Sequence, residues 1–217
     1  LQVLDCAVLV ISAADGVQGH TETLWKLLKR YEIPVFIFVN KMDQDGTDKK
    51  AVLGELRERF GEGCIDFTRI LPEAEASPEE LENLAVCEEG MMEEYLETGS
   101  IRIDTLRKAA AERKIFPCWF GSALRAEGIE ALMDGIVQLA PEIHYPEEFG
   151  AKVYKIARDS QGTRLTYLKV TGGSLRVKDV LADTGEKINQ VRLYSPGKLG
   201  TPQGVDAGQV CAVTGPG

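Results

Sequence analysis

A chain of 217 residues, 44% of them hydrophobic, can form two domains with separate cores, because a domain commonly contains about 100 to 150 residues. The net charge of −9 argues against a general RNA-binding surface, and the chain has no apolar run of the roughly 20 residues that a membrane span requires. Its five cysteines are scattered without a C-x-x-C pair, which favours free thiols in a reducing, cytoplasmic compartment over disulfides or a metal site.

The first part of the chain alternates apolar runs with helical patterns, which predicts an α/β domain with a mostly parallel sheet. A buried strand is expected at Cys6 to Ile11, followed by a helix near Thr21 to Arg30. A second buried strand is expected at Val35 to Val39, and a helix near Lys49 to Phe60 comes after it.

The most informative motif is Asn40-Lys41-Met42-Asp43, directly after the second expected strand. Open α/β sheets bind their ligands at the carboxyl ends of their strands, which is where this motif lies. An ionised Asp43 can accept hydrogen bonds from the ring N1–H and the exocyclic amine of guanine, a pair of donors that adenine lacks. Asn40 can bond the far edge of the base and brace neighbouring loops, while the alkyl stem of Lys41 can lie across the ring face. The motif therefore predicts guanine recognition, against the alternative of a polar turn that only ends a strand.

The segment from Ser77 to Arg113 is expected to form two helices, the first opened by Ser77-Pro78-Glu79-Glu80. A third apolar strand is expected at Ile115 to Phe120. An apolar stripe at helical spacing then predicts a helix whose stripe is entirely core, formed by Ile129, Leu132, Met133, Ile136 and Val137.

A second loop with the character of a ligand site follows the strand Ile115 to Phe120. Its small residues let the backbone approach a ligand closely, and the N–H of Ala123 can be aimed at the guanine O6. We therefore expect Ser122, Ala123 and Leu124 to share a guanine site with the Asn40 to Asp43 motif.

No segment matches the phosphate loop G-x-x-x-x-G-K-[ST], whose amides and lysine hold phosphates and whose hydroxyl holds Mg²⁺. We therefore expect no catalytic residue and no metal ligand in this chain. Because it also begins at Leu1, in what resembles the middle of a fold, we expect it to be a piece of a larger protein.

Beyond Phe149 the pattern changes to short alternating strands separated by Gly and Asp turns, which predicts an all-β barrel.

Taken together, these motifs resemble those of the translational GTPases. The segments Val3 to Ile11 and Asp15 to Gln18 are similar to the strand and loop that follow the second switch of that family. Beyond the proline-rich junction, Lys152 to Ile156 and Arg164 to Val170 are similar to its second-domain β-barrel.

The resemblance implies how the chain is divided and what it binds. Residues 1–145 would be the distal part of a P-loop GTPase domain, with a reduced helical insert at about 61–113, and residues 146–217 would form the barrel, whose completeness is left open. The full-length protein would bind GTP or GDP with Mg²⁺ and act on the ribosome, contacting rRNA and ribosomal proteins. Its phosphate loop and catalytic residues would lie upstream of Leu1.

Several alternatives remain at this stage. The reduced insert favours the tetracycline-resistance ribosomal protection type over elongation factor G or peptide-chain release factor three. A truncated, non-hydrolysing binding module is a further alternative, as is an unrelated α/β domain in which the motif is a coincidence. If the strand Cys6 to Ile11 is an exposed sheet edge, we expect it to pair between two copies of the chain, to aggregate, or to be covered by a shifted amino-terminal segment.

Overall fold

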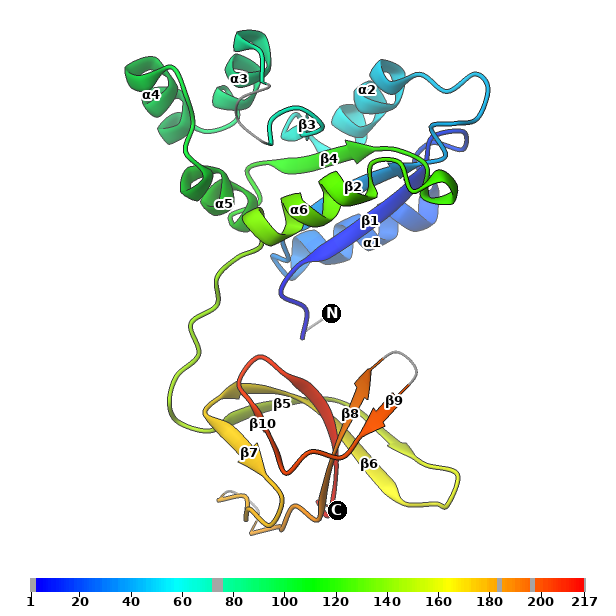
Figure 1. Cartoon of the computed structure of the whole chain (residues 1–217), viewed down its shortest axis with the longest axis vertical. Coiled ribbons are helices and arrows are strands. Elements are labelled where there is room, and N and C mark those ends of the chain that lie inside the picture. Colours follow the sequence, from blue (N-terminus) through cyan, green and yellow to red (C-terminus); the bar gives the residue numbers. More distant parts are fainter. Residues whose placement is uncertain (1–2, 72–75, 183–184, 196–197, 217) are drawn as a thin grey trace. The chain divides into compact units, whose positions relative to one another are not determined.

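The computed structural model describes residues 3–71, 76–182, 185–195 and 198–216 (Figure 1). They form two compact units, one within Val3–Glu142 and the other within Ile143–Pro216.

A four-stranded parallel sheet forms the centre of the first unit, as the sequence predicts. The strands follow the order β1-β2-β4-β3, and their bounds are Ala7–Ser12 for β1, Val35–Asn40 for β2, Cys64–Asp66 for β3 and Phe116–Phe120 for β4. Strand β3 is not predicted from the sequence, because three residues are too few to show an alternating pattern.

Helices cover both faces of this sheet (Figure 1). Successive residues of β2 point to opposite faces, so its apolar side chains contact helices on both of them. On one face Ile37 packs with the helices α1 (Gly19–Arg30) and α2 (Lys49–Phe60). On the other face Phe38 packs with residues of α5 (Ile103–Ala111) and α6 (Ile129–Leu139). A strand that is buried on both faces has a continuous run of apolar residues. This is why Val35 to Val39 can be recognised in the sequence as a buried strand.

Three helices, not two, occupy the segment from Ser77 to Arg113. They are α3 (Pro78–Ala85), α4 (Glu89–Thr98) and α5 (Ile103–Ala111). A break separates α3 from α4 because the Glu88 carboxylate accepts a hydrogen bond from the Met91 N–H and caps a new helix. Gly99 ends α4 in a left-handed conformation, with φ of +73°.

Helix α6 (Ile129–Leu139) packs on the sheet through only part of its apolar stripe. Leu132 is buried, but Met133 and Val137 are 55% and 78% exposed, so the prediction that the whole stripe is core is wrong for these two residues. The helix approaches β4 through Gly135, where an added Cβ would lie 2.1 Å from a ring atom of Trp119. That close approach fixes which side of α6 faces the core.

One face of β1 is also exposed. Leu9 and Ile11 are buried against the rest of the core, whereas Val8 and Val10 are 40% and 60% exposed. Strand β1 therefore forms an edge of the described sheet and carries exposed apolar side chains on one face.

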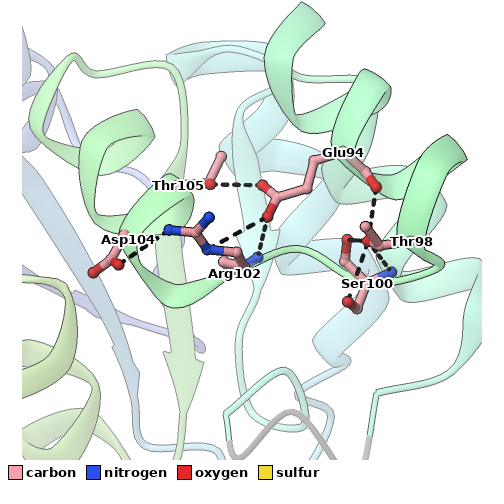
Figure 2. Close-up of polar contacts among 6 residues, drawn as sticks. All are labelled: Glu94, Thr98, Ser100, Arg102, Asp104 and Thr105. Carbon is pink, nitrogen blue, oxygen red and sulfur yellow. Dashed lines mark hydrogen bonds and ion pairs between the residues drawn. The ribbon is translucent and has the colours of Figure 1, made fainter.

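A polar network fixes the turn between α4 and α5 (Figure 2). The Glu94 carboxylate accepts hydrogen bonds from the Thr105 hydroxyl at 2.6 Å and from the Arg102 backbone N–H at 3.2 Å. Within the turn, the Thr98 hydroxyl donates to the Glu94 carbonyl at 2.8 Å. The carboxylate thus lies at the N-terminus of α5, where the helix dipole favours negative charge.

The second unit is all-β, as predicted. Its strands are β5 (Gly150–Arg158), β6 (Arg164–Gly172), β7 (Ser174–Arg176), β8 (Gln190–Ser195), β9 (Lys198–Gly200), β10 (Gly204–Asp206) and β11 (Val210–Thr214). Five of them form an antiparallel sheet in the order β5-β6-β11-β8-β9, and β10 pairs with β7. The core contains Leu168, Val170, Leu175, Ile188 and Val213.

Replacing Glu94 with alanine is expected to lower the free energy of unfolding of the first unit by about 1 to 2 kcal/mol, since two hydrogen bonds to a carboxylate are lost. Urea unfolding followed by helical circular dichroism measures this. The matched control is Glu93→Ala, an exposed residue on the same helix, whose effect should stay within about 0.5 kcal/mol. Equal effects of the two substitutions would contradict the role of the network.

Candidate functional site

The loops that follow β1, β2 and β4 meet at one edge of the sheet. The three strands are parallel, so their carboxyl ends lie together (Figure 1). Direct hydrogen bonds join the loops: Ala13 N–H donates to the Asn40 carbonyl at 2.8 Å, and Met42 N–H donates to the Gly121 carbonyl at 3.0 Å. The structure thus brings together the two segments that the sequence assigns to one site.

Asn40 is the residue that links these loops most directly. It is the last residue of β2, and its Oδ1 accepts hydrogen bonds from Lys41 N–H at 2.8 Å and from Ala123 N–H at 2.9 Å. Both bonds use the amide oxygen, so the amide nitrogen is the part of Asn40 that can address acceptors on a base.

The backbone N–H of Ala123 points in a different direction from the one expected. Its N–H is directed at the Asn40 side chain, whereas the sequence reasoning directs it at the guanine O6. The physical reason is that Asn40 presents a good acceptor within 2.9 Å of this donor. Ala123 therefore braces the loop that lies beside the motif.

Ser122 has an internal role. Its side chain is only 1% exposed, and its hydroxyl accepts a hydrogen bond from Arg125 N–H at 3.4 Å. Backbone bonds in both directions pair Ser122 with Glu127, at 3.1 and 3.0 Å. Gly121 packs so tightly that an added Cβ would lie 2.1 Å from the Glu127 carbonyl oxygen. These contacts make the backbone of the loop well determined.

Leu124 lies at the tip of this loop and is 92% exposed. It belongs to the short 3₁₀ helix η2 (Ala123–Arg125). An apolar side chain in this position can pack against a planar ligand that enters between the two loops.

Lys41 reaches towards the loop after β1. Its φ of +66° lies in the left-handed region, and its Nζ is 3.7 Å from Oδ2 of Asp15. Both side chains are about half exposed, so this pair is weak and the lysine stem can adjust to a ligand. The sequence reasoning did not include Asp15 in the site, because only the fold reveals that the ends of β1 and β2 are neighbours.

Asp43 is more enclosed, with its side chain 15% exposed. Its Oδ2 lies 3.4 Å from Nε of Arg125, whose side chain is 59% exposed. Sequence reasoning also missed Arg125. The sequence does contain a signal for it: Arg125 directly follows Leu124, on a loop expected to face the Asp43 carboxylate.

The site combines polar and apolar groups. It offers one carboxylate, one amide, a long alkyl stem and an exposed leucine around a single edge of the sheet. Within the described ranges, no group of three or more His, Cys, Asp or Glu side chains could hold a metal ion. Over the same residues, no helix is both long and apolar enough to cross a bilayer.

Comparison with known proteins gives consistent matches. The elongation factor Tu GTP-binding domain matches residues 1–142. The tetracycline resistance protein TetW of Butyrivibrio fibrisolvens is 34% identical over 92% of this chain. The oxytetracycline resistance protein of Streptomyces rimosus is 29% identical over 99% of the chain, and elongation factor G of Aquifex pyrophilus is 26% identical over 99%.

A solved structure supports the fold. The crystal structure of a protein from Thermus thermophilus superimposes with a TM-score of 0.77 over 98% of this chain, at 23% identity, and 39% of that structure is covered. The chain spans 34%, 37% and 41% of the lengths of the three sequence relatives.

Replacing Asn40 with alanine is expected to loosen the contact between the two loops, because the amide N–H groups of Lys41 and Ala123 lose their acceptor while the backbone bond from Met42 to Gly121 remains. Amide hydrogen exchange followed by NMR should then be about fivefold faster at Ala123, the factor that loss of a hydrogen bond of about 1 kcal/mol gives. The control is Gln44→Ala, an exposed position on the same loop. Unchanged exchange at Ala123 in the Asn40 variant would contradict the bracing role.

Proposed function

The chain belongs to the translational GTPase family that carries the elongation factor Tu GTP-binding domain, and on this premise we propose that its first unit recognises guanine nucleotides through Asn40, Lys41 and Asp43. The observation that carries the proposal is the hydrogen bond of 2.9 Å between Asn40 Oδ1 and Ala123 N–H. It joins the N-K-x-D motif to the S-A-L loop at the edge of the sheet where ligands of such folds bind.

Each group in the site has a chemical role in this proposal. The Asp43 carboxylate accepts from N1–H and the exocyclic amine of guanine, which gives discrimination against adenine. The Asn40 amide nitrogen donates to the acceptors on the opposite edge of the base. The Lys41 stem and Leu124 cover the ring faces, while Ser122 and Ala123 hold their loop in position.

We propose that the full-length protein hydrolyses GTP, with Mg²⁺ bound beside the phosphates. The 217 residues contain no phosphate-binding motif, so the chain by itself should bind the base and leave the phosphates exposed to solvent. We therefore expect weak guanine binding and no turnover from this chain alone.

The action on the ribosome is proposed to be of the tetracycline-resistance ribosomal protection type, in the cytoplasm. Two resistance proteins, from Butyrivibrio fibrisolvens and Streptomyces rimosus, match nearly the whole chain. The segment at about 61–113, between the two guanine loops, is short and mainly helical, which supports the same choice. Translocation of the elongation factor G type is the alternative.

The second unit is the part of this chain that we propose contacts rRNA. Residues 143–217 carry ten Lys or Arg and seven Asp or Glu, whereas residues 1–142 carry 15 and 27. Three tyrosines from different strands lie in a row: the ring centroids of Tyr154 and Tyr167 are 6.2 Å apart, and those of Tyr167 and Tyr194 are 5.7 Å apart. Lys155 Nζ lies 5.3 Å from the Tyr167 ring centroid. Aromatic rings beside cations are suited to stacking with unpaired bases.

Self-association through the expected edge strand Cys6 to Ile11 is proposed as a property of the chain by itself. Strand β1 has one neighbour, β2, in the described sheet, and its Val8 and Val10 side chains are exposed. An unpaired apolar edge of this kind favours pairing between copies.

The base-recognition proposal predicts a change of specificity on replacing Asp43 with asparagine. The asparagine amide cannot accept from both guanine donors, but it can donate to the 2-oxo group of xanthine while its oxygen accepts from N1–H. In NMR titrations the wild type should bind guanosine in preference to adenosine. The variant should lose about tenfold or more in guanosine affinity and prefer xanthosine.

Asp45→Asn, an exposed change on the same loop, is the control and should keep the wild-type preference. Equal binding of guanosine and adenosine by the wild type would instead favour an α/β domain whose motif is a coincidence.

The GTPase assignment predicts what the gene encodes immediately upstream of Leu1. A phosphate loop, followed by the switch motif D-x-x-G-H, should be encoded within about 100 residues upstream of Leu1, the scale of half to one domain. The protein extended to include it should hydrolyse GTP, and the 217-residue chain should not. Turnover by the chain alone, or a start codon with no such loop, would contradict the assignment.

A further inference from the structure

We propose that Arg125 competes with guanine for the Asp43 carboxylate and thereby sets the affinity of the base site. The inference rests on the proposed guanine site and adds a residue that neither the motif nor the comparisons assign. It follows from the contact of 3.4 Å between Arg125 Nε and Asp43 Oδ2.

The two groups that would use Asp43 have the same hydrogen-bonding pattern. A guanidinium presents a planar fork of N–H donors that fits a carboxylate. Guanine presents N1–H and the adjacent exocyclic amine, again a planar pair of donors. The Asp43 side chain is only 15% exposed, and its Oδ2 already contacts Arg125. In this proposal the two sets of donors cannot use this carboxylate at the same time.

The backbone that carries Arg125 is held by hydrogen bonds, while its side chain is largely exposed. The loop is held by the Ser122 pairing with Glu127 and by the hydrogen bond from Arg125 N–H to the Ser122 hydroxyl. The guanidinium itself is on a side chain that is 59% exposed. An incoming base therefore displaces it by rotation of one side chain, without any change in the loop.

The cation within the motif, Lys41, does not take the same role. Lys41 is directed at Asp15, with an Nζ–Oδ2 distance of 3.7 Å. Each acidic residue of the site is thus matched with a cation from the neighbouring loop, and Arg125 is the one that engages the carboxylate expected to read the base.

The size of the effect follows from the exposure of the pair. Ion pairs with one exposed partner are weak, so removal of Arg125 should raise guanosine affinity by about two- to fivefold. Guanosine is uncharged, so the salt dependence of its binding reports on the Arg125–Asp43 pair. Added salt screens the pair, and wild-type affinity should rise between about 0.05 and 0.5 M salt.

The test is an NMR titration of the 217-residue chain with guanosine and adenosine, comparing the wild type with Arg125→Met. Arg30→Met is the matched control, because it removes the same charge from an exposed position at the end of α1. Arg125→Met should bind guanosine about two- to fivefold more tightly than both the wild type and the control, with no dependence on salt. Arg125→Lys keeps the charge without the planar fork and should fall between the two.

Unchanged or weaker guanosine binding by Arg125→Met, while the wild type still prefers guanosine to adenosine, would overturn the inference and leave the proposed function standing. If the wild type and the variant both fail to distinguish guanosine from adenosine, the proposed base site fails, and the inference fails with it.

Discussion

The side-chain amide of Asn40 is the contact on which the geometry of the site depends. Asn40 ends β2, and its partner across the parallel register is Ser12 at the end of β1. Its oxygen then accepts the Ala123 N–H from the loop after β4. One residue therefore sets the distance between loops that are 83 positions apart in the chain. Together with the backbone bond from Met42 N–H to the Gly121 carbonyl, this bond fixes the carboxylate of Asp43 relative to the leucine at the tip of the second loop.

The charges at this edge of the sheet are arranged in pairs that cross from loop to loop. Lys41 belongs to the β2 loop and contacts Asp15 of the β1 loop, while Arg125 of the β4 loop contacts Asp43. Such pairs contribute little to stability because their cations are exposed. In the proposed base site their effect is on the ligand, because a planar base that enters between the loops would have to replace contacts that a side chain already makes.

The parts of the fold that the sequence predicts well are those fixed by local pattern. Strand β2 is identifiable because both of its faces are buried. The third helix of the insert is missed because the break at Glu88 depends on a side-chain cap that the apolar pattern does not show. The stripe on α6 is over-interpreted because its spacing cannot reveal that Gly135 and Trp119 fix the orientation of the helix. In the site, the motif residues are recognisable by type, but Asp15 and Arg125 come from other loops and enter only through the topology.

In the proposed base site, the Arg125–Asp43 pair and the Lys41–Asp15 pair have different effects on ligand specificity and ligand affinity. Discrimination is a difference between two binding free energies, so a group changes it only if it affects one ligand more than the other. A competitor at Asp43 opposes guanine, which needs that carboxylate, and leaves adenine unaffected, because adenine offers no donor pair to it. Arg125 therefore lowers guanine affinity and guanine preference by the same factor. Because Lys41 addresses the ring face, which all bases share, the Asp15 contact acts on every base alike. In the proposed base site, the Arg125–Asp43 pair would set specificity, and the Lys41–Asp15 pair would act on the affinity for every base.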